Sequence, residues 1–241
     1  MNMMNLLPLF LAVGALAQVV DRPVETFSTR EGPLKIVPIH HASLMMEANG
    51  QVVHVDPWSQ GNYDSLPQAD IILITDIHPD HLDPKILTRL RKPSTVIFAP
   101  EAVAKTVDGA TIMRNGDTKT FGKWTFEAIP MYNEKRGPEP GKRYHDKGRG
   151  NGYTVTYGGF HVYISGDTEG TPEMRSLKSI DVAFIAMNLP YTMPPEEAAE
   201  AVKQFHPKIV YPYHYRDSDL SKFEKALSGS GIEVRLRNWY Y

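Results

Sequence analysis

The sequence of 241 residues contains no cysteine. This absence excludes disulfide bonds, a thiolate nucleophile and metal sites built on thiolate ligands. A metal site would have to use histidine, aspartate, glutamate or asparagine, which gives weight to the nine histidines. An excess of positive charge is also lacking, because 26 basic residues face 28 acidic ones and the formal net charge is -2. We therefore expect no nucleic-acid partner, which would need a clustered basic surface.

Long apolar runs are scarce too. The longest, residues 6–16, is too short to cross a bilayer as a helix, and Ala15-Leu16-Ala17 fits a small-residue cleavage site. Residues 1–17 are thus predicted to be a signal peptide, although no lysine or arginine precedes the run. The mature chain, residues 18–241, would then be secreted or periplasmic, without a stable membrane anchor. A buried N-terminal helix is the alternative.

Short runs rich in valine and isoleucine recur between turn residues, which is typical of β-strands. Asn49-Gly50 and Gly158-Gly159 tolerate positive φ and predict two tight hairpins. Residues 18–32 are polar and are expected to form an extended lead-in. Strands are expected near Thr111 and over residues 34–39, 43–47, 52–56, 71–75, 95–98, 118–121, 124–131, 152–157, 160–165, 182–187, 209–213 and 233–236.

Helices are expected over residues 84–90, 100–107, 194–205 and 220–227, the third with apolar residues at helical spacing. In each half of the chain hairpins come first and β-α units follow. Two sheets packed face to face with helices outside satisfy this order. The predicted fold is therefore one α/β domain, a four-layer αββα sandwich, with ligands where the loops after the strands converge.

Ligand-type side chains follow three of these strands. Asp167 stands after the strand 160–165 and His214 after the strand 209–213. A single such residue is more often a helix cap, a turn former or a hydrogen-bonded side chain than a ligand. Three occurrences at strand ends predict a metal centre of imidazole and carboxylate groups. Four further groups lie within six positions directly after the buried strand 71–75: Asp76, His78, Asp80 and His81.

The segment Asp76-Ile77-His78-Pro79-Asp80-His81 resembles the HxHxDH motif of the metallo-β-lactamase superfamily. The resemblance runs from about Leu34 to the C-terminus and is greatest to ascorbate-6-phosphate lactonase-like proteins and N-acylphosphatidylethanolamine-type phospholipases D. It implies the metallo-β-lactamase sandwich and metal-dependent hydrolysis. Four other segments resemble family motifs: His41-Ala42-Ser43, Val55-Asp56-Pro57-Trp58, Ile164-Ser165-Gly166-Asp167-Thr168 and Pro212-Tyr213-His214-Tyr215.

The resemblance also implies roles for these residues. His78 would bind a first metal ion, Asp80 and His81 a second, and Asp167 would bridge the two. His214 would complete the second site. A further aspartate, Asp56, would accept a hydrogen bond from a ligand histidine and so orient it.

The sequence departs from the family motif at two positions. Asp76 stands where the motif has its first histidine, and a carboxylate shifts metal preference toward harder ions. The third histidine of the first site is expected after the strand 124–131, where Asn133 stands. Either Asn133 or His145, farther along the same loop, would replace it, and we favour His145. This loop, residues 133–151, includes the basic run 135–149, which we expect to be solvated at the mouth of the site.

The leading hypothesis is a hydrolase that uses a metal-activated water on an ester, lactone or phosphodiester of a small molecule. Two divalent ions are expected, zinc first, with manganese or iron as alternatives. Asp80 would orient the attacking hydroxide, and His41 or a tyrosine would stabilise the oxyanion. The alternative is a degenerate family member that binds a metal or small ligand without turnover. A nuclease is disfavoured by the charge balance.

Overall fold

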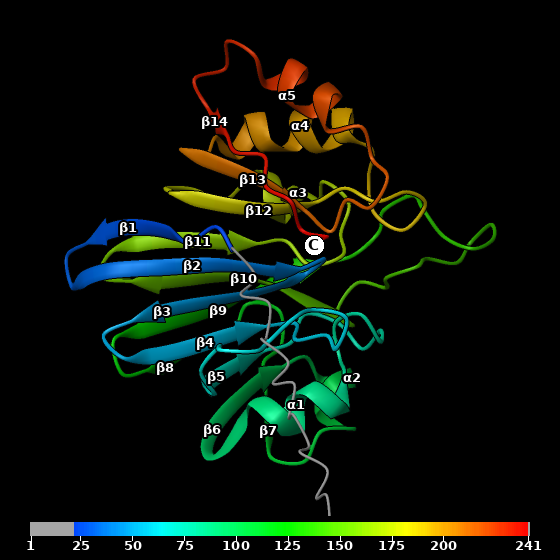
Figure 1. Cartoon of the computed structure of the whole chain (residues 1–241). Helices are drawn as coiled ribbons and strands as arrows, with labels where there is room; N and C mark the ends of the chain where they lie inside the picture. The colour runs from blue at the N-terminus through cyan, green and yellow to red at the C-terminus, as the bar shows by residue number, and fades with distance from the viewer. Residues whose placement is uncertain (1–21, 241) are drawn as a thin grey trace, which may run out of the picture.

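The computed structural model describes residues 22–240, so the predicted signal peptide, residues 1–17, lies outside it. Two seven-stranded sheets lie face to face, as Figure 1 shows, in the orders β1-β2-β3-β4-β5-β6-β7 and β14-β13-β12-β11-β10-β9-β8. The strands of the first sheet are β1 Glu25–Thr29, β2 Gly32–His40, β3 Ser43–Ala48, β4 Gln51–Val55, β5 Ala69–Leu73, β6 Arg91–Ala99 and β7 Ala110–Ile112. Those of the second are β8 Thr118–Phe121, β9 Trp124–Met131, β10 Gly150–Tyr157, β11 Phe160–Ile164, β12 Val182–Ala186, β13 Ile209–Tyr213 and β14 Glu233–Val234.

The two halves of the chain repeat one pairing scheme. In the first sheet β1 to β4 pair antiparallel, and β4 to β7 pair parallel. In the second sheet β8 to β11 pair antiparallel, and β11 to β14 pair parallel. The strands that precede the predicted ligand loops, β5, β11 and β13, all belong to the parallel parts.

Helices cover the outer face of each sheet. α1 Pro84–Leu90 and α2 Glu101–Ala104 pack on the first sheet, while α4 Pro195–Phe205 and α5 Leu220–Leu227 pack on the second. The two pairs lie at opposite ends of the view in Figure 1. Separate apolar clusters fill the space between the sheets and the space under each helical layer. The predicted four-layer αββα sandwich is confirmed. Between residues 22 and 240 no helix has the length and apolar character needed to span a bilayer.

The lead-in before Gly32 is extended as expected, and residues 25–29 within it form a strand, β1, that was not predicted. This edge strand pairs with β2 and buries only Phe27. An edge strand needs just one apolar face, so the polar residues of β1 gave no strand pattern in the sequence. The closing strand is also shorter than expected, since β14 ends at Val234. Arg235 and Arg237 then bind Glu25 of β1 and draw the chain across the sandwich.

Two short helices also differ from expectation. α2 ends at Ala104 rather than near residue 107, although the Val103 carbonyl still accepts the Val107 N–H, and the chain then turns at Gly109, whose φ of 74° suits glycine. The helix α3, Pro172–Arg175, was missed. Its four residues are too few for any periodicity to show. The Thr171 side chain accepts the Met174 N–H and caps it, as the sequence Thr-Pro would have indicated.

The C-terminal segment ties the two sheets together beside the ligand loops. The Trp239 indole is fully buried between the sheets, where it packs edge-on against Phe184 and Tyr213. The Trp239 carbonyl accepts the His41 N–H at 3.0 Å, and the His41 carbonyl accepts the His214 N–H at 3.0 Å. These two backbone hydrogen bonds thus join the C-terminal tail, the end of β2 and the end of β13.

We predict that Trp239→Ala lowers the free energy of unfolding by about 3–5 kcal/mol, because it leaves a ring-sized cavity in a dry core. Urea unfolding followed by circular dichroism measures the change. Trp239→Phe is the control, since it keeps a ring and the indole N–H has no hydrogen-bond partner within residues 22–240. Equal stability of the alanine variant and the wild type would contradict a packing role for the tail.

Candidate metal centre

His81 is held by a buried network behind the site. Asp56, at the end of β4, accepts hydrogen bonds from the Thr75 N–H at 2.7 Å, the Thr75 hydroxyl at 2.5 Å and His81 Nδ1 at 2.9 Å. All three side chains are fully buried. Because Nδ1 donates its proton to a carboxylate, Nε2 is the ring nitrogen of His81 that faces Asp167. The hydrogen bond expected between Asp56 and a histidine of the motif is present.

Asp167 lies at the centre of three imidazoles. Its carboxylate oxygens are 3.2 Å from His214 Nε2, 3.4 Å from His81 Nε2 and 3.5 Å from His145 Nε2. Burial alone would raise the pKa of Asp167, but His214 and His81 outweigh burial and hold the pKa below its usual value. The structure therefore brings together four predicted residues from four separate loops around one buried carboxylate.

A second group of possible ligands surrounds Asp76. Its Oδ2 lies 2.7 Å from His78 Nδ1 and 3.9 Å from His145 Nε2. His145 is fixed by Asn133, whose side-chain oxygen accepts both the His145 backbone N–H at 2.9 Å and Nδ1 at 2.7 Å. The Asn133 amide nitrogen donates to Glu169 and to the Tyr191 carbonyl. Asn133 is thus committed to orienting His145, and His145 is the one with a free ring nitrogen beside Asp76.

Arg149 is a site residue that the sequence analysis missed. Its guanidinium binds both oxygens of Asp76, with Nε 3.2 Å from Oδ1 and Nη2 3.0 Å from Oδ2. The expectation that the whole run 135–149 is solvated was wrong at this residue, whose side chain is one-quarter exposed. The signal was a carboxylate directly after a buried strand, because a buried charge needs a partner. Burial would raise the pKa of Asp76, but the His78 hydrogen bond, His81 and Arg149 lower it to about 2.

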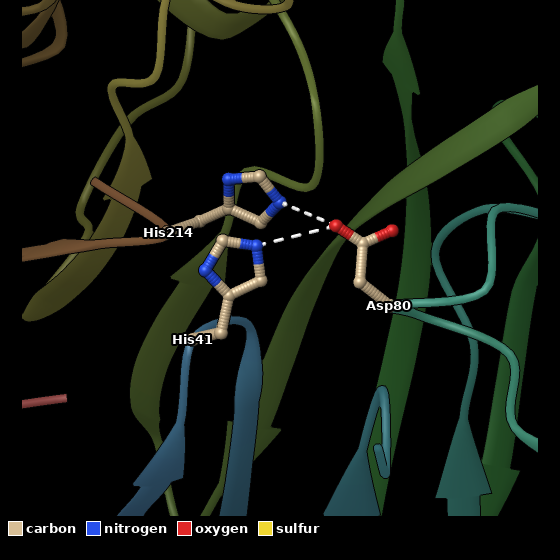
Figure 2. Close-up of side chains that lie close together, drawn as sticks. All are labelled: His41, Asp80 and His214. Carbon is tan, nitrogen blue, oxygen red and sulfur yellow. Dashed lines mark hydrogen bonds and ion pairs between the residues drawn. The ribbon is translucent and has the colours of Figure 1, made fainter. Parts of the chain in front are cut away.

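His41, Asp80 and His214 form a third group, drawn in Figure 2. Asp80 Oδ2 lies 3.2 Å from His41 Nε2 and 3.5 Å from His214 Nε2. Burial and the neighbouring His214 lower the pKa of His41 to about 4, so its ring is neutral at pH 7. Because Asp80 only accepts hydrogen bonds, the His41 proton is on Nε2.

The other ring nitrogen of His41, Nδ1, is hydrogen-bonded to the C-terminal tail. Nδ1 lies 2.7 Å from the Tyr240 hydroxyl, whose oxygen also accepts the Arg216 N–H at 2.7 Å. Since Nδ1 of the neutral ring accepts, the Tyr240 hydroxyl donates to it. His41 therefore presents an N–H to the site and lacks a free lone pair for a metal ion. Tyr240 was not identified from the sequence, because nothing local links position 240 to position 41.

The residues present fit a metal ion. The buried Nε2 atoms of His81, His145 and His214 and Oδ1 of Asp167 have no hydrogen-bond partner within the described range. Buried polar atoms rarely stay unpaired unless a ligand, an ion or water satisfies them. Imidazole nitrogen with carboxylate oxygen is a donor set for zinc, manganese or iron. Each of the three groups places its ligand atoms within 4.8 Å of one another.

An open cavity of about 380 Å³ lies over these groups and is lined by five of their members: His78, Asp80, His145, Asp167 and His214. Trp58, Tyr144 and Tyr191 stand on its walls, and the last two pack edge to face with ring centroids 5.0 Å apart. Tyr144 belongs to the long loop between β9 and β10, which projects on the right in Figure 1. The predicted position of this loop at the mouth of the site is confirmed in part, since its ends also reach the floor through His145 and Arg149.

Residues 35–214 match the profile of the family described as the beta-lactamase superfamily domain. The chain belongs to this superfamily. A UPF0173 metal-dependent hydrolase of Lysinibacillus sphaericus is 30% identical over 211 residues, which cover 80% of this chain and 92% of that protein. A UPF0173 metal-dependent hydrolase of Thermococcus kodakarensis is 29% identical over 220 residues, covering 83% of this chain and 95% of that protein.

Solved structures agree with this superfamily assignment. A crystal structure from Parabacteroides distasonis, named as a metal-dependent hydrolase, is 44% identical with a TM-score of 0.85 and covers 90% of this chain and 98% of that one. A metallo hydrolase from Ignicoccus hospitalis is 22% identical with a TM-score of 0.70, covers 85% and 94% of the two chains, and shows the shared fold. The predicted enzyme class, a metallo-β-lactamase-fold hydrolase, is confirmed.

We predict that Asp56→Asn weakens divalent metal binding by about 10- to 100-fold, because His81 loses the carboxylate that fixes its tautomer. Competition against a chelating dye measures the affinity. Asp117→Asn is a matched control at an exposed turn that accepts the Arg114 N–H. Thr75→Val removes only the hydroxyl donor and should give a smaller loss. Unchanged affinity in a folded Asp56→Asn protein would contradict the orienting role.

We predict that Tyr240→Phe removes the hydrogen bond to His41 Nδ1 while Nε2 keeps its proton against Asp80. The ¹⁵N resonance of Nδ1 in metal-free, histidine-labelled protein should then move toward that of a free imidazole nitrogen. The control is Tyr215→Phe, because the Tyr215 ring packs on Tyr240 but its hydroxyl donates to the Arg237 carbonyl. An unmoved signal, or a protonated Nδ1 in the wild type, would refute the assignment.

Proposed function

We propose that the protein is a hydrolase that directs a metal-activated water at an ester, lactone or phosphodiester bond in a small molecule. One observation carries this proposal: three buried imidazole Nε2 atoms, none with a hydrogen-bond partner within residues 22–240, converge on Asp167 beside an open cavity. The names of the relatives support metal-dependent hydrolysis. The three bond types come from the resemblance to ascorbate-6-phosphate lactonase-like proteins and N-acylphosphatidylethanolamine-type phospholipases D, and the relatives' names do not specify a bond.

The proposed ligand set follows the three groups. Asp76, His78 and His145 would hold one divalent ion, and Asp167 lies between this group and the next. Asp80, His81 and His214 would hold the other. We propose zinc, with manganese or iron favoured to the extent that Asp76 replaces an imidazole by oxygen. A bound ion lowers the pKa of a water molecule and supplies hydroxide at neutral pH.

The protein's own groups would position the reaction. The second oxygen of Asp80 is 4.0 Å from His81 Nε2, so the Asp80 carboxylate reaches from the metal-binding histidines to the cavity and can orient the attacking water. The His41 N–H lies beside it, at the same carboxylate, and would donate to the oxyanion that forms. His41 is suited to this role because its neutral ring, fixed by Tyr240, offers a donor without a competing lone pair.

A binding protein without turnover is the second candidate, and the Asp76–Arg149 pair is the observation that favours it. Both oxygens of Asp76 are engaged by a guanidinium, which adds a positive charge next to the first ion position. Like charges repel a divalent ion, and the effect is strong where burial limits screening. Weak binding at the first position would leave a single ion at the second.

We predict about two bound ions per chain by elemental analysis of protein purified without chelator. We also predict turnover of at least one of 4-nitrophenyl acetate, γ-butyrolactone and bis(4-nitrophenyl) phosphate. His81→Ala should lower kcat/KM by more than about 100-fold, since even groups behind a ligand histidine contribute about 10- to 100-fold. His206→Ala is the control, because His206 ends α4 and bonds the Ser230 carbonyl.

Full activity in His81→Ala would end the hydrolase proposal. One ion or none, not restored by adding zinc, manganese or iron, together with no turnover, would favour the binding protein.

A further inference from the structure

Arg216 shares a backbone feature with the residues that build the metal centre. Non-glycine residues rarely adopt positive φ, and those that do cluster at functional sites. Eight non-glycine residues between residues 22 and 240 have a positive φ, and four of them lie at this site: His41 at 53°, Asp56 at 42°, His214 at 49° and Arg216 at 43°. Arg216 is two residues beyond His214 and has no role in the groups described above. Its strained backbone therefore calls for an explanation of its own.

The turn that carries Arg216 is fixed on both sides. The Ser218 N–H bonds the Tyr215 carbonyl at 2.9 Å, which places Arg216 at the second position of a tight turn, where a positive φ usually selects glycine. The Arg216 N–H donates to the Tyr240 hydroxyl, and the Ser218 hydroxyl donates to the Met187 carbonyl. The side chain of Arg216 is thus aimed by a rigid frame.

The guanidinium of Arg216 makes one long ion pair, with Asp80, and leaves its N–H groups available. Its side chain is half exposed and lines the cavity. Within residues 22–240 its nearest carboxylate is Asp80, at 3.9 Å, and it makes no side-chain hydrogen bond. By contrast, Arg149 binds both oxygens of Asp76, and Arg136 binds Glu197 with both arms. Arg216 is therefore the arginine of the cavity that is free to bind a ligand.

Asn188 adds a second donor on the same cavity. The residue is 5% exposed, lines the cavity, and its side-chain nitrogen has no hydrogen-bond partner within the described part of the chain. Its backbone is held by Thr192, whose hydroxyl accepts the Asn188 N–H at 2.6 Å. A buried amide N–H without a partner is unfavourable in the free protein and gains when a ligand oxygen satisfies it.

The charged residues of the cavity favour a negatively charged ligand. Asp80 and Asp167 line the cavity opposite one arginine, Arg216, so one bound divalent ion would make this set net positive. Arg216 and Asn188 both donate and would meet an acceptor with planar oxygens. Two such donor groups suit a carboxylate, whereas a phosphate site normally offers several backbone N–H groups as well.

We propose that Arg216 and the Asn188 amide bind the carboxylate of a small organic acid, whose flat apolar part lies between Trp58, Tyr144 and Tyr191. The proposal rests on the proposed function for the statement that this acid is the substrate. The cavity of about 380 Å³ limits it to a small molecule. Arg216 and Asn188 would then determine specificity by binding the charged group of the substrate beside Asp80.

The test is calorimetric titration of the protein, with the metal it retains on purification, using benzoate, the neutral amide benzamide, and phenyl phosphate. Arg216→Gln should weaken benzoate binding about tenfold or more, since a charge-assisted hydrogen bond is lost. Arg216→Lys should retain part of the affinity, and Asn188→Ala should weaken benzoate binding by a smaller factor. Benzamide binding should be equal in all variants.

Arg89→Gln is the matched control, because it removes the same charge from an exposed arginine of α1 that pairs with Asp64. Equal benzoate affinity in wild type and Arg216→Gln, or no benzoate binding at all, would overturn the proposal. Tighter, Arg216-dependent binding of phenyl phosphate would overturn the choice of carboxylate.

Turnover is measured separately, on the ester, lactone and phosphodiester set. Arg216-dependent benzoate binding without turnover would refute the hydrolase and leave the acid site standing. Turnover without Arg216-dependent benzoate binding would refute the acid site and leave the hydrolase standing.

Discussion

The site depends on one buried carboxylate. Asp56 is wholly excluded from water and accepts three hydrogen bonds, two from Thr75 and one from His81. Burial raises the pKa of Asp56, and the His81 and Thr75 donors act against that shift. Because an unpaired buried charge is strongly unfavourable, this network holds the end of β4, the end of β5 and the ligand loop in one arrangement. His81 points its free nitrogen at Asp167 as a consequence.

The repeat in the two sheets explains why distant loops meet. Each half of the chain changes from antiparallel to parallel pairing after its fourth strand, so β5 in one sheet corresponds to β12 in the other. Parallel strands deliver their following loops to one edge of a sheet, and face-to-face packing brings the two edges together. The two backbone hydrogen bonds that link Trp239, His41 and His214 then fix one edge relative to the other. Strand ends therefore position Asp76, Asp167 and His214, whereas His145 is held on the long loop by Asn133.

The sequence was sufficient for features that repeat locally and insufficient for those that depend on tertiary contact. Strand periodicity, the two hairpins and the run from Asp76 to His81 are local, so the sandwich and the place of this loop beside the cavity were predictable. β1 and α3 were not, because a polar edge strand and a single helical turn carry almost no periodic signal. The sequence left open whether Asn133 or His145 replaces the third histidine. The structure bears on this question because the Asn133 side-chain oxygen accepts the His145 Nδ1 proton, which leaves His145 Nε2 facing the site.

Arg149 and Tyr240 show the same limit within the site. Arg149 looked like one charge in a solvated run, and only the buried carboxylate of Asp76 makes it part of the floor. Tyr240 lies 199 positions from His41 and contacts it because the tail turns back after β14. Neither pairing has a spacing rule that a sequence pattern reveals, so both follow from the path of the chain and not from the motif.

The Asp76–Arg149 pair also bears on how the two ion positions differ. Imidazole, the usual group at this place in the motif, is neutral, and a carboxylate joined to a guanidinium is neutral as a pair. The substitution thus keeps the net charge of the position while changing the donor atom from nitrogen to oxygen. An arginine stands beside each proposed ion position, Arg149 at Asp76 and Arg216 at 3.9 Å from Asp80. The two differ in how they engage the carboxylate, because Arg149 hydrogen-bonds both oxygens of Asp76 whereas Arg216 makes no hydrogen bond to Asp80. An ion at the first position would therefore compete with a guanidinium for its carboxylate ligand, and an ion at the second would not.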